Sequence, residues 1–267
     1  MSARITECFV ACKRNNRTAF IPYIMAGDPS PAATLNIMHA LADNGADMLE
    51  IGFPFSDPVA DGATIQAAGN RALAEGMTLK AVLTLCTSFR QRNTTTPLIL
   101  MGYANPLMQY GYKECAQAMK IAGIDGLIVV DLPPEEEAEL LPHLTTHAVC
   151  LIRLIAPTTR SERLQRLIHS ASGFIYVIGI NGITGTGSAD LAVLQQRIAE
   201  IQCHTSLPVV TGFGIRTTDQ ARELHGIADG VVVGSALVDT LFKAGTAGAE
   251  QAASRFARAM AESLQSH

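Results

Sequence analysis

The sequence predicts an α/β fold: a (β/α)8 TIM barrel made of one domain that spans residues 1–267, with an extra helix at the N-terminus. Eight apolar runs rich in Val, Ile and Leu alternate with helical patterns, and such runs are typical of parallel strands buried on both faces. Eight βα units in about 250 residues are typical of a closed barrel. No linker-like or low-complexity stretch divides the chain. An open doubly wound sheet is the alternative, but it would not need eight units.

The strands are expected at the apolar runs, which cover Ala19–Ala26, Ala46–Gly52, Pro97–Tyr103, Gly126–Asp131, Ala148–Ile155, Phe174–Ile180, Pro208–Gly212 and Gly230–Gly234. The helical stretches between them are Ala32–Asn44, Thr64–Ala74, Leu79–Gln91, Tyr112–Ala122, Glu135–Thr145, Arg160–His169, Ala189–Ile201 and Thr218–Leu224. Ser2–Arg14 is expected to be the extra helix, which caps one end of the barrel, and Ala249–Leu264 a final helix.

Composition limits the class of protein. Hydrophobic residues make up 48% of the 267 residues and charged residues 16%, which suits a domain with a large core. The net charge of −4 gives no sign of a nucleic-acid or anionic-membrane surface. No window approaches the roughly 18 apolar residues of a membrane span, and the N-terminus lacks the apolar core of a signal peptide. We therefore expect a cytoplasmic protein that binds neither nucleic acid nor membrane.

The six cysteines are dispersed, at Cys8, Cys12, Cys86, Cys115, Cys150 and Cys203. No Cys-x-x-Cys pair occurs, and no His stands at metal-ligand spacing. Cys8 and Cys12 would share a helix face, but two thiols alone do not make a zinc site. Reduced, mostly buried cysteines and no metal site are expected.

Two carboxyl groups in unlike surroundings mark the stretch from Met48 to Gly62. Glu50 lies near the end of an apolar strand, where desolvation would raise its pKa, and Asp61 lies in the Pro-rich loop that follows. Such a pair can supply an acid and a base at one pH. Strand alternation places Glu50 on one face with Met48 and Gly52, and we expect this face to point into the barrel mouth.

Structural roles compete with catalysis at each acid. Glu50 could be a buried partner of Lys or Arg, but no basic residue lies near it in sequence, so catalysis is preferred. Asp61 could equally be an N-cap of the next helix. Asp57, before Pro58, is expected to be a turn residue.

Glycine-rich turns follow the last three strands, at residues 181–187, 211–216 and 234–235. Glycine lets backbone N–H groups approach an anion, and a helix starting at Ser235 would add its free amides and dipole. Any one of these turns alone would only reverse the chain. Three at adjacent strand ends favour a phosphate site, since barrels commonly bind phosphate there.

Three tyrosines lie near strand ends: Tyr23, Tyr103 and Tyr176. Buried aromatic residues usually pack in the core. Their position near the strand ends leaves a flat apolar pocket as the second interpretation.

The stretch from Leu49 to Gly62, Leu-Glu-Ile-Gly-Phe-Pro-Phe-Ser-Asp-Pro-Val-Ala-Asp-Gly, resembles without a gap the signature of the tryptophan synthase alpha subunit. The resemblance covers essentially the whole chain and includes further motifs at Phe20–Pro29, Tyr103–Pro106, Asp131–Pro133, Gly182–Gly185, Gly212–Ile215 and Val233–Ala236. It implies a lyase that cleaves indole-3-glycerol phosphate to indole and glyceraldehyde 3-phosphate. It also implies a beta subunit, in an alpha2-beta2 heterotetramer, that uses PLP to join indole to serine. The alpha chain itself would need no cofactor.

The resemblance also implies roles for single residues. Glu50 would protonate the indole ring and take the proton of the glycerol hydroxyl, and Asp61 would accept a hydrogen bond from the indole N–H. Pro54 and Asp57 would belong to a loop that meets the partner. The substrate would be held by Tyr23, Tyr103, Tyr176, Thr184, Gly185, Phe213, Gly214, Gly234 and Ser235.

The chain departs from the family pattern after Tyr176. Gly179 replaces the usual Ser, and Ile180 stands where a polar or basic residue is common. Met25 and Ala63 stand where Thr and Pro are common. These changes concern loop closure and communication with the beta subunit, and both carboxylates are retained. The alternatives are therefore a stand-alone lyase that releases indole, a weakly active allosteric partner of the beta subunit, or another phosphate-binding barrel such as a sugar-phosphate isomerase.

Overall fold

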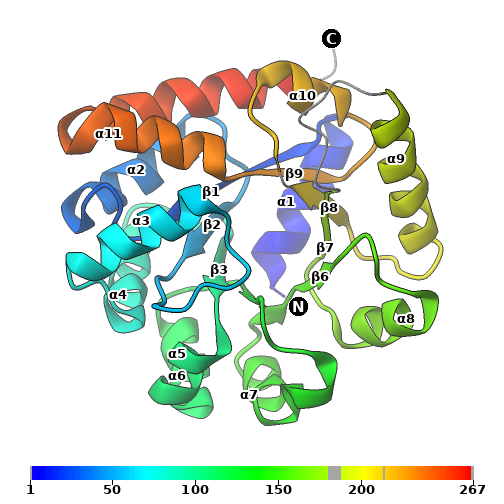
Figure 1. The fold of residues 1–267 in the computed structure, drawn as a ribbon, viewed down its shortest axis with the longest axis horizontal. Helices are drawn as coiled ribbons and strands as arrows, with labels where there is room; N and C mark the ends of the chain where they lie inside the picture. The colour runs from blue at the N-terminus through cyan, green and yellow to red at the C-terminus, as the bar shows by residue number, and fades with distance from the viewer. Residues whose placement is uncertain (1, 180–187, 213, 266–267) are drawn as a thin grey trace.

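The computed structural model describes residues 2–179, 188–212 and 214–265, and its centre is a ring of parallel strands (Figure 1). The strands are β1 (Ala19–Met25), β2 (Leu49–Gly52), β3 (Leu98–Gly102), β4 (Gly126–Val129), β5 (Cys150–Leu151), β6 (Arg153–Ile155), β7 (Ile175–Ile178), β8 (Val209–Gly212) and β9 (Gly230–Val233). Their order is β5-β4-β3-β2-β1-β9-β8-β7-β6, and every pairing is parallel.

The ring closes at a divided strand. β5 and β6, which end the strand order, are parts of the single predicted run Ala148–Ile155 and are separated only by Ile152. The first part pairs with β4 and the second with β7. The eight predicted strands and the (β/α)8 barrel are thus confirmed, with the fifth strand shared between its two neighbours.

Helices surround the ring and leave the strands buried (Figure 1). They are α2 (Pro31–Asp43), α3 (Ala63–Ala74), α4 (Leu79–Arg90), α6 (Tyr112–Ile121), α7 (Leu141–Thr146), α8 (Ser161–Ser170), α9 (Ser188–Gln202) and α10 (Thr218–Glu223). Local capping fixes several of their starts: Ser30 and Thr78 accept backbone N–H bonds at α2 and α4, and Thr217 with Gln220 forms a capping box at α10.

Three helical segments differ from the prediction. A short helix, α5 (Ala104–Tyr110), directly follows β3 and was not expected. The predicted helix Glu135–Thr145 is divided into a 3-10 turn, η1 (Pro134–Glu139), and α7, because Pro142 has no N–H to continue a helix through this point. The predicted helix Ala249–Leu264 is the second part of α11 (Ser235–Ser263), which bends at Gly245, where φ is 64°.

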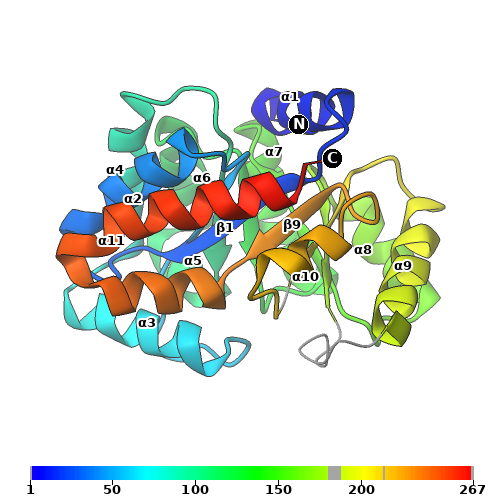
Figure 2. The ribbon, with the colours of Figure 1, turned by 90° about the horizontal axis from the view of Figure 1, so that it is seen from above.

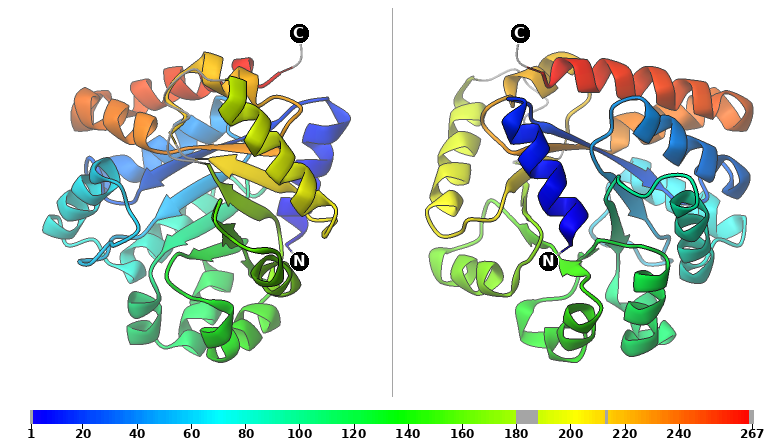
Figure 3. Two further views of the ribbon diagram at one scale, coloured as in Figure 1. Left: turned by 45° about the vertical axis from the view of Figure 1, so that its right-hand side comes forward. Right: turned by 180° about the vertical axis from the view of Figure 1, so that it is seen from behind.

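The extra N-terminal helix, α1 (Ala3–Arg14), crosses the amino ends of the strands, as predicted (Figure 3). It buries Ile5, Phe9 and Cys12, and the ring of Phe9 meets that of Phe174, just before β7, edge-on at 5.8 Å. In Figure 2, α1 lies at the upper edge of the molecule and α3, which follows the carboxyl end of β2, at the lower edge. The carboxyl ends of the strands are therefore free of this cap.

Along the described residues, no helix combines the length and the apolar character needed to cross a membrane.

Candidate active site

Glu50 is a buried acid without a partner in the described part of the chain. Glu50 is 1% exposed. It lies on β2, where the sheet register pairs it with Tyr23 of β1 and Ile99 of β3. Its Oε2 accepts no hydrogen bond from the described residues, and none of their Lys or Arg side chains forms an ion pair with it. Burial raises the pKa of Glu50 to about 8. The carboxyl group therefore keeps its proton at neutral pH.

Glycines at strand ends make room for the two tyrosines near this acid. A Cβ at Gly52 would overlap the hydroxyl of Tyr23, and one at Gly212 would overlap the hydroxyl of Tyr176. Burial raises the pKa of both tyrosines, and the negative charge of Glu50 adds to the effect in each case. For Tyr23 the charge of Asp61 contributes more than that of Glu50. Tyr23 thus lies within electrostatic reach of both carboxylates.

Asp61 is held by Tyr103 and does not cap the next helix. The N-cap of α3 is Gly62, which makes no side-chain capping bond. The hydroxyl of Tyr103 accepts the N–H of Ala60 at 3.1 Å and is hydrogen-bonded to the carboxylate of Asp61. Burial raises the pKa of Asp61, and the bond from Tyr103 partly opposes this shift. The two acids therefore differ in kind: Asp61 has a hydroxyl partner, whereas Glu50 has none among the described residues.

A hydrogen bond at the next residue, Ala104, helps to hold the backbone of Tyr103 in place. The N–H of Ala104, the first residue of α5, donates to Oδ1 of Asp131 at 2.8 Å. This bond joins the Tyr103–Pro106 and Asp131–Pro133 segments. Asp131 was not among the predicted site residues, although its place just after β4, beside the end of β3, was the signal that could have identified it.

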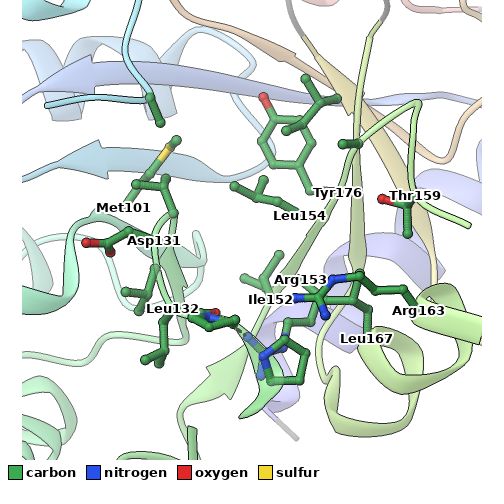
Figure 4. A pocket seen from close by; sticks show the side chains of 17 residues that line it. Met101, Asp131, Leu132, Ile152, Arg153, Leu154, Thr159, Arg163, Leu167 and Tyr176 are labelled. Atoms are coloured by element: carbon green, nitrogen blue, oxygen red, sulfur yellow. Dashed lines mark hydrogen bonds between the residues drawn. The ribbon is translucent and has the colours of Figure 1, made fainter. Parts of the chain in front are cut away.

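A cavity of about 520 Å3 opens at the carboxyl ends of β3 to β7 (Figure 4). The apolar side chains that line it include Met101, Val130, Leu154, Tyr176 and Ile178, and the polar ones include Asp131, Arg153, Thr159 and Arg163. Its size falls within the usual range for small-molecule sites. Tyr176 thus lines a pocket of mixed polar and apolar character, and a flat apolar pocket formed by the three tyrosines stays a prediction.

The structure describes only some residues of the three turns predicted to bind phosphate. α11 begins at Ser235, directly after Gly234, as expected, so the amides of its first turn point out of the helix. Gly214 has a φ of 82°, a conformation that favours glycine. Thr184, Gly185 and Phe213 lie outside the described residues. Phosphate binding at these turns stays a prediction.

The loop after β2 projects toward solvent beyond its first residues. Pro54 is buried, whereas Asp57 is exposed and accepts a hydrogen bond from the Ser56 hydroxyl at 2.6 Å. The side chain of Val59 is 84% exposed. Directly after β7, the N–H of Gly179 donates to the carbonyl of Gly212 at 2.9 Å, and Ile180 lies outside the described residues.

These features define a (β/α)8-barrel enzyme with a buried acid at the carboxyl ends of the strands, unpaired among the described residues. Comparison with known proteins identifies its family. The model of the tryptophan synthase alpha chain matches residues 9–266. A tryptophan synthase alpha chain from Caulobacter sp. (strain K31) is 48% identical over 238 residues, which cover 89% of this chain and 86% of that relative.

Solved structures agree. Tryptophan synthase subunit alpha from Legionella pneumophila str. Paris superposes with a TM-score of 0.90 at 39% identity, over 99% of this chain and 98% of that one. A chain of Mycobacterium tuberculosis tryptophan synthase gives a TM-score of 0.89 at 31% identity, over 100% of both chains. The chain belongs to the tryptophan synthase alpha chain family. It is a carbon–carbon lyase that cleaves indole-3-glycerol phosphate to indole and glyceraldehyde 3-phosphate.

Proposed function

We propose that Glu50 and Asp61 carry out this retro-aldol cleavage. The observation that supports the proposal most directly is the state of Glu50, which is buried, has an unpartnered Oε2 among the described residues and has a pKa of about 8. A carboxylic acid that holds its proton at neutral pH can deliver it to a carbon atom.

The proton of Glu50 goes to the indole ring carbon that bears the glycerol phosphate side chain. The ring then carries a positive charge that its N–H shares. The carboxylate of Asp61 accepts this N–H, and the bond from Tyr103 helps to keep Asp61 ionised. An oriented negative charge in a closed pocket stabilises the cation that forms.

The bond between the ring carbon and the side chain breaks next, and its electron pair returns to the ring to give neutral indole. The glycerol hydroxyl gives its proton to the Glu50 carboxylate, and the carbon that carried it becomes the aldehyde of glyceraldehyde 3-phosphate. Glu50 ends the cycle protonated. Because the protonated ring is itself the electron sink, the reaction needs neither a metal nor an organic cofactor in this chain.

Substrate binding would divide between two sides of the barrel mouth. Tyr23, Tyr103 and Tyr176 would surround the indole ring and the glycerol hydroxyls. The phosphate would accept hydrogen bonds from backbone amides at the last three strand ends, with the hydroxyl of Ser235 adding one. The residues proposed there are Thr184, Gly185, Phe213, Gly214, Gly234 and Ser235.

The indole would pass to a beta subunit that carries PLP, in a cytoplasmic alpha2-beta2 heterotetramer. The support for a partner is the family itself and the M. tuberculosis tryptophan synthase to which this chain is similar. Pro54 and Asp57 would belong to the loop at this contact: Asp57 is exposed on the loop that leads to Asp61, and Pro54, which is buried, lies at the start of that loop.

The test is indole release from indole-3-glycerol phosphate by the purified chain, with and without a beta subunit. Slow release that the partner accelerates would support a coupled alpha subunit. Fast release that is indifferent to the partner would instead identify a stand-alone lyase, and no release with an accelerated partner would identify an allosteric subunit. Full turnover by Glu50→Gln would refute the proposed acid in every case.

A further inference from the structure

Two thiols of α1, the helix that crosses the amino ends of the strands, converge with one carboxylate, away from the active site. The Sγ atoms of Cys8 and Cys12 and a carboxylate oxygen of Asp47 all lie within 4.8 Å of one another. Cys8 and Cys12 are one helical turn apart, and Asp47 lies shortly before β2. The geometry points to a site for a thiophilic divalent cation such as Zn2+ or Cd2+, with these three side chains as ligands and a water molecule as the fourth.

The Asp47 carboxylate accepts hydrogen bonds of the kind that position metal ligands in proteins. Arg17 donates to Oδ1 of Asp47 at 2.7 Å and to Oδ2 at 3.1 Å, and the N–H of Phe20 donates to Oδ2 at 2.9 Å. Since Oδ1 accepts only the bond from Arg17 within the described residues, it keeps a lone pair for a cation. Arg17 also approaches the Sγ of Cys12 at 3.6 Å. Such outer contacts orient the ligands of a metal ion.

The charges at this site balance once a divalent ion is bound. Two thiolates and the Asp47 carboxylate carry three negative charges, and the ion with the Arg17 guanidinium carries three positive charges. A neutral total matters because Cys12 is 2% exposed and an unbalanced charge there would be costly. Each thiol loses its proton when its sulfur binds the ion, so the complex forms with release of two protons.

The site can be reached from solvent. Cys8 is half-buried, and Cys12 and Arg17 line a cavity of about 200 Å3 beside α1. An ion held here would join α1 to the entry of β2. Its effect would be on the attachment of the helix that caps the barrel, and the lyase reaction at the opposite end would not depend on it.

The experiment titrates the reduced, chelator-treated full-length chain with Cd2+, followed by thiolate-to-cadmium absorption, and with Zn2+, followed by calorimetry in two buffers of different ionisation enthalpy. We expect one equivalent to bind and about two protons to be released. Cys8→Ser and Cys12→Ser should each weaken binding more than tenfold, and Arg17→Gln roughly 10–100-fold, the usual cost of a lost outer contact. Cys203→Ser, at an exposed cysteine outside the cluster, is the matched control and should bind like the parent.

A measurement on the parent chain makes the test independent of how the variants fold. Zn2+ should protect Cys8 from alkylation, as read by mass spectrometry, and should raise the melting temperature of the parent but not of Cys8→Ser. Unchanged binding in both serine variants would overturn the proposal. So would alkylation of Cys8 at the same rate with and without Zn2+.

Discussion

A buried carboxyl group lies at each end of the barrel, and the two differ in the hydrogen-bond donors that surround them. At the carboxyl end, Glu50 is 1% exposed and its Oε2 has no hydrogen-bond partner among the described residues. At the amino end, Asp125 is 2% exposed and has four donors: the Ser2 hydroxyl at 2.5 Å, Arg4 and Arg90 at 2.8 Å each, and the N–H of Leu98 at 2.9 Å.

Equal burial therefore has different consequences. The donors around Asp125 tie α1, α4 and the start of β3 together, so this acid contributes to stability. The Oε2 of Glu50 forms no hydrogen bond with the described residues, and the charged form of Glu50 is disfavoured in the folded chain. A barrel whose amino end is stable can tolerate such an acid at the end where the reaction occurs.

The largest effect is expected for Glu50→Gln, which should reduce indole release by about 10²–10⁴-fold because the proton donor is lost. The same change should stabilise the fold at high pH. The pKa of Glu50 is raised from 4.5 to about 8, so the folded chain binds more protons than the unfolded chain between these values, and its stability falls as pH rises through them. At pH 9 the parent should be less stable than Glu50→Gln by roughly 3–5 kcal/mol.

Urea unfolding of the parent and of Glu50→Gln at pH 5 and pH 9 measures this difference. Equal stability of the two chains at pH 9 would mean that the carboxylate of Glu50 has a partner in the folded chain.

Asp125→Ala should show the opposite pattern. Removing this acid leaves Arg90, whose guanidinium is largely buried, without its carboxylate, and should destabilise the chain by about 3–5 kcal/mol. The folded fraction should keep the parent rate of indole release at low temperature. Thermal unfolding and a rate corrected for the folded fraction test both statements, and a large loss of rate in a fully folded variant would contradict the division between the two ends.

Asp61→Asn should lower indole release by roughly 10²-fold, since an amide cannot balance the positive charge of the protonated ring. Because the N-cap of α3 is Gly62, the melting temperature should stay close to that of the parent. Steady-state kinetics should place most of the loss in kcat. A large fall in melting temperature with an unchanged kcat would assign Asp61 a structural role.

The smallest effects are expected at Tyr103 and Asp131, which act on Asp61 or on its neighbours. Tyr103→Phe removes the hydroxyl that holds Asp61 and Ala60 and should reduce kcat about tenfold, in line with the loss of one or two hydrogen bonds.

Asp131→Ala should reduce kcat less, by roughly two- to fivefold, because Asp131 is exposed and acts through the backbone of Ala104. Asp131→Asn keeps an oxygen acceptor and serves as the control. Equal losses in the alanine and asparagine variants would show that the charge of Asp131, rather than its position, is what matters.

Most of the fold could be predicted from the sequence because continuous apolar runs and helical patterns are local signals. Where the prediction failed, a local event decided the outcome. Pro142 divided one helix, and α11 runs from the expected start at Ser235 through a bend at Gly245 into the predicted final helix. The short α5 was missed because its seven residues contain Pro106 and give little periodic pattern.

The site could be predicted only as far as strand position allowed. The apolar run placed Glu50 on β2, and alternation predicted the face on which it lies. That its Oε2 has no partner among the described residues depends on which side chains surround it. The bond between Tyr103 and Asp61 joins loops 42 residues apart in sequence, and the contact of Asp47 with the thiols of α1 joins segments 35 to 39 residues apart. Local sequence patterns do not predict contacts between segments this far apart.

The measurement that tests the central claim most directly is the titration of the Glu50 carboxyl carbon by NMR in the ¹³C-labelled chain, assigned by the signal that disappears in Glu50→Gln. The account predicts a midpoint near pH 8. A midpoint at or below the ordinary value of about 4.5 would show that the carboxylate is stabilised in the folded chain, and would contradict its role as an unpaired acid kept for proton transfer.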